Sequence, residues 1–261
     1  MSRARRFLVE TDVTPRIEDD QSASGDRFLI LVEGQETERR YLDDLCGRLY
    51  FSAYNVVIAS PDSDPLNLVW EAVSLRNKEA ARAAEGYTVA YDQVWVVFDR
   101  ESKYHHRLDR IREAIRVARE EGILVAISNP CFELWLILHH EFFVASIPNC
   151  DASEKILTKI QSAGGLGDYD KSKFPLEFYV NSESVVRACG FACKLRERHA
   201  DASSKGDAWW ARDYLSDSKT YDSDGNPSTD VDQLVGQLNL AARAQVRLLP
   251  YPKIRLLPFT R

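Results

Sequence analysis

Acidic residues stand directly after two of the most apolar stretches of this sequence. Glu33 follows the apolar run at residues 28–32, and Asp99 follows the run at 93–98, with Glu101 two residues further on. A charged side chain at the end of a buried strand packs poorly unless a cation binds it. An acid in this position can also be an ordinary loop residue or helix cap. The coincidence of three such acids gives the metal-binding interpretation as much weight as the structural one.

Carboxylates in this arrangement match the needs of a hard divalent cation. Mg²⁺ takes oxygen ligands and commonly uses only one or two carboxylates, which leaves positions for phosphate and water. Two such ions roughly 4 Å apart stabilise both the attacking and the leaving oxygen of a phosphodiester. The residue types therefore indicate phosphodiester chemistry with Mg²⁺ or Mn²⁺ as the cofactor.

The elements that would position these acids alternate regularly along the first half of the chain. Strands are expected at residues 28–32, 55–59, 93–98 and 123–127. Helices are expected between them, at residues 37–49, 65–83 and 108–121. Such a series predicts an α/β fold, an open parallel sheet with helices on both faces. Ligands of an open parallel sheet collect at the carboxyl ends of its strands, and Glu33, Asp99 and Glu101 are expected there.

The chain as a whole is expected to divide into three parts. Residues 1–26 are predicted to be a mobile polar leader, residues 27–145 the α/β core, and residues 146–261 a mostly helical part packed on that core. Further helices are predicted over residues 132–140, 152–162, 181–199, 206–215 and 230–248.

Composition narrows the class of protein. Of 261 residues, 44% are hydrophobic, which is enough for a real core and excludes disorder of the whole chain. The formal net charge of −6 argues against a chain that coats nucleic acid by bulk electrostatics, but leaves room for a nuclease whose acids bind cations. No apolar run approaches the roughly 20 residues of a membrane helix, and no signal peptide is visible. A cytoplasmic protein with no membrane partner is expected.

Several common chemistries lose support. The sequence contains no P-loop lysine motif, no G-x-G-x-x-G and no G-x-S-x-G elbow, which disfavours ATP hydrolysis, dinucleotide binding and serine hydrolysis. The five cysteines form no C-x-x-C pair, and they are expected to be buried free thiols rather than metal ligands or disulfides.

Three motifs, in this order, resemble the signature of the RloB-like proteins. They are EGQETE at residues 33–38, VVFDRE at 96–101 and SNPCFELW at 128–135, with His139 beyond. The resemblance extends over roughly residues 27–250. The RloB-like family in turn resembles the Toprim nucleases, the group that includes the catalytic domains of topoisomerases and primases. This implies a Toprim-like version of the open parallel sheet with a helical C-terminal extension, and Mg²⁺- or Mn²⁺-dependent endonuclease activity.

The resemblance also implies roles for individual residues. Glu33 takes the place of the invariant Toprim glutamate, and Asp99 that of the first acid in the D-x-D pair. Glu101 departs from the pattern, because the pair usually ends in aspartate; the longer side chain can bind a metal but shifts its position. Lys171, within a Tyr-Asp-Lys sequence, would stabilise charge on the scissile phosphate. The alternative for Lys171 is a solvated loop charge.

Other candidate residues keep two interpretations each. Glu133, on the first turn of a predicted helix, is either a further metal or water ligand or a favourable charge at a helix N-terminus. His139 and His140 are expected to be structural, with a contact to a metal-binding carboxylate as the alternative. The remaining candidates either contact a nucleic acid or belong to solvated loops: Lys103, His105, His106, Arg107 and Lys173.

The family context adds expectations about biological role. An endonuclease effector of anti-phage defence by abortive infection is expected, cleaving RNA, including transfer RNA, slightly in preference to DNA. An ATPase of the ABC or AAA kind, encoded nearby, is the expected partner, and a homodimer is left open. The alternative is a non-catalytic Toprim-like subunit that regulates the ATPase, although the intact acids count against it. A third interpretation is hydrolysis or transfer on a smaller phosphate-bearing substrate.

Overall fold

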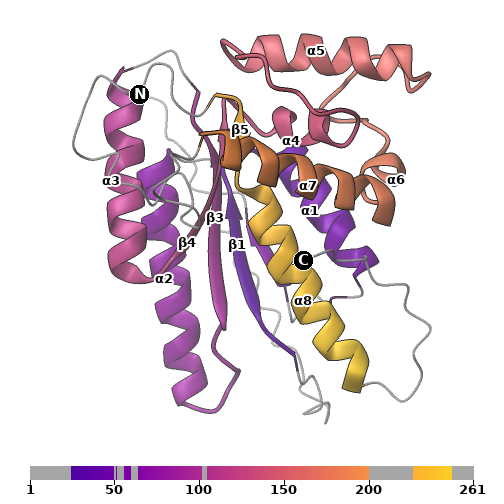
Figure 1. The fold of residues 1–261 in the computed structure, drawn as a ribbon. Coiled ribbons are helices and arrows are strands. Elements are labelled where there is room, and N and C mark those ends of the chain that lie inside the picture. The colour runs from indigo at the N-terminus through magenta and orange to yellow at the C-terminus, as the bar shows by residue number, and fades with distance from the viewer. Residues whose placement is uncertain are drawn as a thin grey trace, which may run out of the picture.

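The protein folds as an open, mostly parallel five-stranded sheet with helices on both faces (Figure 1). This computed structural model describes residues 25–49, 51, 56–59, 64–101, 105–199 and 226–248, with the side chains of 105–107, 199 and 245–248 left out. The predicted α/β fold class is confirmed. Most of the predicted leader, the predicted helix at 206–215 and Lys103 lie outside the described residues.

The strands of the sheet have the order β2-β1-β3-β4-β5. Their bounds are β1 (Phe28–Val32), β2 (Val56–Ala59), β3 (Gln93–Asp99), β4 (Leu124–Asn129) and β5 (Ser228–Thr229). The first four pair in parallel, as the continuous apolar runs predict. The two-residue β5 runs antiparallel to the end of β4. The sequence predicts no strand there, because two polar residues show no strand periodicity.

Eight helices surround the sheet within the described residues. They are α1 (Thr37–Arg48), α2 (Pro65–Ala84), α3 (His105–Glu121), α4 (Glu133–Leu138), α5 (Cys150–Ala163), α6 (Leu176–Tyr179), α7 (Ser182–His199) and α8 (Val231–Leu248). The prediction for α4 was too long at both ends, and the single turn of α6 was not predicted. None of these described helices combines the length and the apolar character needed to cross a membrane.

Local sequence explains where the helices begin and end. Helix α2 starts with a proline, and the Asp64 side chain before it accepts a hydrogen bond from the backbone N–H of Leu66 at 3.1 Å. Helix α3 is followed by Gly122, whose φ of 67° lies in the left-handed region that glycine adopts without strain.

Two separate apolar clusters lie on the two faces of the sheet. Alternate residues of the strands pack against α2 and α3 on one face, including Leu29, Val96 and Ile127. Their neighbours along the same strands pack on the other face, against α1, α4, α7 and α8, including Ile30 and Val97. Figure 1 shows the two layers on either side of the strands. The sheet is thereby held from both sides, with its carboxyl edge left for polar residues.

A buried ion-pair cluster fastens the C-terminal elements together. Arg196 of α7 forms two hydrogen bonds with the carboxylate of Asp232 on α8, and its Nη1 donates to the backbone oxygen of Thr229 at 2.9 Å. Asp230, whose side chain is fully buried, lies 3.8 Å from the same guanidinium. Burial raises the pKa of Asp230 and of Asp232, and Arg196 opposes this shift. The guanidinium therefore compensates two buried acids.

We expect Arg196→Met to lower the free energy of unfolding by about 3–5 kcal/mol, because it leaves buried acids without their counter-charge. Arg116→Met is the matched control: Arg116 forms ion pairs on the exposed face of α3, and its loss should cost less than about 1 kcal/mol. Urea denaturation followed by circular dichroism measures both. Equal stability of the two variants would show that the Arg196 cluster does not support the fold.

Candidate metal-binding site

Carboxylates from four elements gather at the carboxyl edge of the sheet. Glu33 directly follows β1, and its backbone N–H donates to the oxygen of Val97 at 2.9 Å, which extends the pairing of β1 with β3. Its Oε2 accepts a hydrogen bond from the backbone N–H of Asp99 at 3.1 Å. Glu38 and Glu133 join them from the first turns of α1 and α4. Glu33 and Asp99 thus lie side by side, each at the carboxyl end of its strand.

The backbone after β3 is held against the backbone after β4. The N–H of Arg100 donates to the oxygen of Ser128 at 2.8 Å, and the N–H of Glu101 donates to the oxygen of Pro130 at 3.0 Å. Glu101 has a φ of 40°. Among the residues that the structure describes, it is the one non-glycine residue with a left-handed backbone conformation. Such a conformation costs on the order of 1 kcal/mol and is often found at functional sites. Glu101 itself is exposed, two residues after Asp99 in the chain.

Glu38 is a functional candidate that the sequence analysis missed. It is 7% exposed and lies on the buried side of α1, on the same stripe as Tyr41, Leu42 and Leu45. A charged residue at this helical spacing among apolar ones was the signal that could have found it. Its carboxylate packs against Gly34: a Cβ at position 34 would lie 2.0 Å from Oε2 of Glu38. The glycine of the EGQETE motif thus makes room for the last glutamate of that motif, Glu38.

Glu133 is buried, at 3% exposure, and is surrounded by donors. Its Oε1 accepts a hydrogen bond from the hydroxyl of Tyr169 at 3.0 Å. The hydroxyl of Thr37 lies 3.5 Å from the same oxygen, and Nζ of Lys171 lies 3.5 Å from it. These contacts fix the orientation of the Glu133 carboxylate and hold the loop that carries the Tyr-Asp-Lys sequence against α4.

Lys171 brings a positive charge to the edge of the carboxylate cluster. Its Nζ forms a closer ion pair with Glu154 of α5, at 2.9 Å, than with Glu133. Its backbone oxygen accepts a hydrogen bond from Nη1 of Arg40 at 3.0 Å, which ties the loop to α1. The lysine is half-exposed, so its ammonium group also faces solvent.

The carboxylates interact with one another electrostatically. Burial, with a contribution from Glu133 and Glu33, raises the pKa of Glu38 to about 7, against the opposing effect of its own backbone N–H and of Lys171. Burial raises the pKa of Asp99 well above its usual range, and the charges of Glu38 and Glu133 add to this shift. Burial would lower the pKa of Lys171, but Glu133 and Glu154 outweigh it and raise the pKa. Full ionisation of the cluster would therefore place more negative charge here than its surroundings balance.

The oxygen donors of this cluster suit a hard divalent cation. Glu33 and Asp99 are joined through one hydrogen bond, and Glu38 is brought close by the absence of a side chain at Gly34. Mg²⁺ and Mn²⁺ prefer such carboxylate oxygens, and a bound cation would neutralise the repulsion between them.

The other predicted residues do not all join this cluster. Lys173 is exposed in the loop, where its N–H donates to the oxygen of Asp170 at 3.0 Å. The backbone of His105, His106 and Arg107 forms the first turn of α3, and their side chains are outside the description.

His139 and His140 are built into the core instead, as expected. Nε2 of His139 lies 3.2 Å from the Tyr41 hydroxyl and Nδ1 lies 2.8 Å from the oxygen of Trp135. Nε2 of His140 lies 2.9 Å from the Tyr179 hydroxyl. Burial lowers the pKa of His139 to about 3 and that of His140 to about 4, so both are neutral at pH 7.

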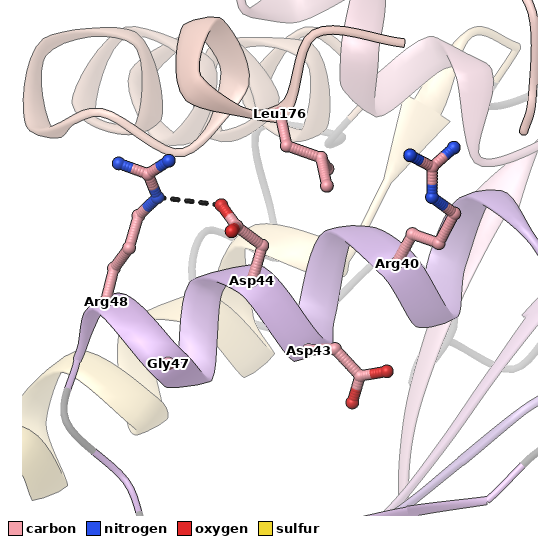
Figure 2. A pocket seen from close by; sticks show the side chains of 6 residues that line it. All are labelled: Arg40, Asp43, Asp44, Gly47, Arg48 and Leu176. Carbon is pink, nitrogen blue, oxygen red and sulfur yellow. Dashed lines mark hydrogen bonds and ion pairs between the residues drawn. The ribbon is translucent and has the colours of Figure 1, made fainter. Parts of the chain in front are cut away.

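A surface pocket lies beside α1, on the side where α6 approaches it. Figure 2 shows its lining, with the ion pair between Arg48 and Asp44 at 2.7 Å, and Leu176 of α6 above the helix. Arg40 lines the pocket too, and it also holds the backbone of Lys171. Two arginines and two aspartates line the pocket, so it has no single charge sign to attract a polyanion.

The fold and the site define a class: an α/β protein with a carboxylate cluster at the carboxyl edge of a mostly parallel sheet. The model of the family described as "RloB-like protein" matches residues 28–238 of the chain. The chain belongs to the RloB-like family. Searches of curated proteins and of solved structures find no significant match.

We expect Glu38→Gln to stabilise the metal-free protein increasingly as the pH rises. Because the pKa of Glu38 is about 7 in the folded protein and ordinarily 4.5, its charge opposes folding fully above pH 7 and little below pH 4.5. The gain in free energy of unfolding over wild type should grow by roughly 2–3 kcal/mol between pH 5 and pH 8. Denaturation in EDTA at each pH measures it.

The comparison is between two proteins at the same pH, so the contributions of His139 and His140 cancel. Glu36→Gln, an exposed residue just before α1, is the control and should show no such growth. A constant difference between Glu38→Gln and wild type across this pH range would contradict the buried, strained charge assigned to Glu38.

Proposed function

We propose that this protein is a metal-dependent phosphodiesterase, an endonuclease of the Toprim type that uses Mg²⁺ or Mn²⁺. The observation that carries the proposal is the meeting of Glu33, Asp99 and Glu38 at the carboxyl edge of the sheet, where burial and mutual repulsion call for a cation. Open α/β sheets bind their ligands at this edge. Membership of the RloB-like family agrees with this class of activity.

The acids of the cluster are proposed to have different roles in binding the metal. Glu33 and Asp99 are the proposed main ligands, since a hydrogen bond already fixes one to the backbone of the other. Glu101, exposed at the rim, is a proposed additional ligand on the solvent side, and Glu38 on the buried side. A bound Mg²⁺ or Mn²⁺ would neutralise charge on the phosphate and favour ionisation of a water nucleophile.

Glu133 and Lys171 act together in this proposal. The sequence leaves Glu133 either a metal or water ligand or a charge at a helix N-terminus, and its contacts with Tyr169 and Lys171 favour a positioning role. Glu133 and Glu154 hold the Lys171 ammonium group at the rim of the cluster. From there the lysine can stabilise the negative charge that develops on a scissile phosphate.

The proposed substrate is nucleic acid, with RNA, including transfer RNA, slightly preferred to DNA. Lys103, His105, His106 and Arg107 follow Asp99 closely in sequence and are proposed to contact the polymer, together with Lys173 of the loop. The proposed setting is anti-phage defence by abortive infection, in the cytoplasm and with an ABC- or AAA-type ATPase as partner. A regulatory, non-catalytic role toward that ATPase is the alternative.

We expect Asp99→Asn to reduce metal-dependent cleavage on the order of a hundredfold or more, because it removes a ligand charge while keeping the side-chain volume. The assay follows labelled RNA, transfer RNA and DNA with Mg²⁺ or Mn²⁺, with and without EDTA. It is run with the protein alone, and again with the candidate ATPase and ATP.

Asp109→Asn is the control, because this acid lies exposed on α3 and pairs only locally with Arg112. It should cleave like the wild type. Cleavage by Asp99→Asn at the wild-type rate would contradict the proposed site. No metal-dependent cleavage by the wild type under either condition would overturn the nuclease proposal in favour of the regulatory subunit.

A further inference from the structure

Two cysteines that the proposed magnesium chemistry does not use meet Asp99 at the edge of the sheet. The Sγ atoms of Cys131 and Cys150 and a carboxylate oxygen of Asp99 all lie within 4.8 Å of one another. Cys131 is buried just after β4, and Cys150 is partly accessible at the first position of α5. Three separate elements thus bring two thiols and one carboxylate to a single point.

The donor set points to a thiophilic cation rather than a hard one. Thiolates select soft and borderline metals such as Zn²⁺, whereas Mg²⁺ prefers oxygen alone. In tetrahedral zinc sites with Zn–S bonds near 2.3 Å, two sulfur ligands lie about 3.8 Å apart. Atoms no more than 4.8 Å apart need only small side-chain movements to reach that geometry. We propose that Asp99, Cys131 and Cys150 form a zinc site with a fourth position open to water.

The surroundings favour a dication at this point. Cys150 begins a helix of 14 residues, and the positive end of the helix dipole favours a thiolate there. Glu38 and Glu133 interact electrostatically with Asp99, and Glu133 also with Cys131, so the local potential is negative. As each sulfur binds the metal, its thiol proton passes to solvent. The two positive charges of the zinc ion replace those of the two thiol protons that are released.

Asp99 belongs both to the proposed zinc site and to the proposed magnesium site, and this affects the proposed nuclease activity. An Asp99 carboxylate turned toward the two sulfurs is withdrawn from the oxygen cluster with Glu33, so zinc and magnesium compete for it. Zinc would then inhibit the nuclease. This consequence rests on the proposed function, whereas zinc binding itself does not.

Binding to the full chain is measured without any substrate. The protein is reduced with a phosphine, stripped of metal and titrated with Zn²⁺ against a chromogenic chelator. We expect one equivalent to bind tightly. Cys150→Ser should weaken binding by at least the roughly 10- to 100-fold that loss of an outer partner of a zinc ligand costs. Cys193→Ser, an exposed thiol on α7, should leave the affinity unchanged.

A second measurement needs no variant. Zinc should protect Cys150 from alkylation by iodoacetamide, read by peptide mass spectrometry, while Cys193 reacts equally with and without the metal. Absence of stoichiometric zinc binding by the wild type, or equal weakening by Cys150→Ser and Cys193→Ser, would overturn the site. Either result leaves the cleavage assay with Mg²⁺ and Mn²⁺ unaffected, so the two proposals fail separately.

Discussion

Repulsion between carboxylates that the fold holds partly out of water is the constraint on which the rest of this structure depends. Parallel strands bring Glu33 and Asp99 to the same edge, and the first turn of α1 adds Glu38. Their charges are costly in the metal-free protein, as the pKa of about 7 for Glu38 indicates. Stability of the two apolar layers compensates for that cost, since natural domains tolerate local strain at functional sites when the surrounding fold over-determines them.

The elements beyond the first four strands help to organise this edge. The loop before α6 reaches back to Glu133 through Tyr169 and Lys171, and Arg40 holds the loop against α1. On the other side, β5 extends the sheet beside β4, and Arg196 holds β5 and the start of α8 in place. The C-terminal helices thus support the site from outside, although they contribute few of its acids.

Much of this arrangement could be predicted from the sequence, and the failures have physical reasons. Buried parallel strands appear as continuous apolar runs, so the position of Glu33 and Asp99 at strand ends followed from where those runs stop. Glu38 was missed as a site residue because it entered only as the last letter of the EGQETE motif, although it occupies an apolar stripe of α1. The thiols of Cys131 and Cys150 lie 19 residues apart in sequence, and only the fold brings them together. The short β5 gave no pattern at all.

The central claim is that the carboxyl edge of the sheet binds a divalent cation through Glu33 and Asp99. Crystals of the protein grown with Mn²⁺, and measured at wavelengths on both sides of the manganese absorption edge, test it most directly. We expect an anomalous peak at this edge, within about 2.0–2.3 Å of carboxylate oxygens of both residues, the range of metal–oxygen bonds in such sites. Well-ordered carboxylates with no anomalous peak between them at saturating Mn²⁺ would contradict the claim.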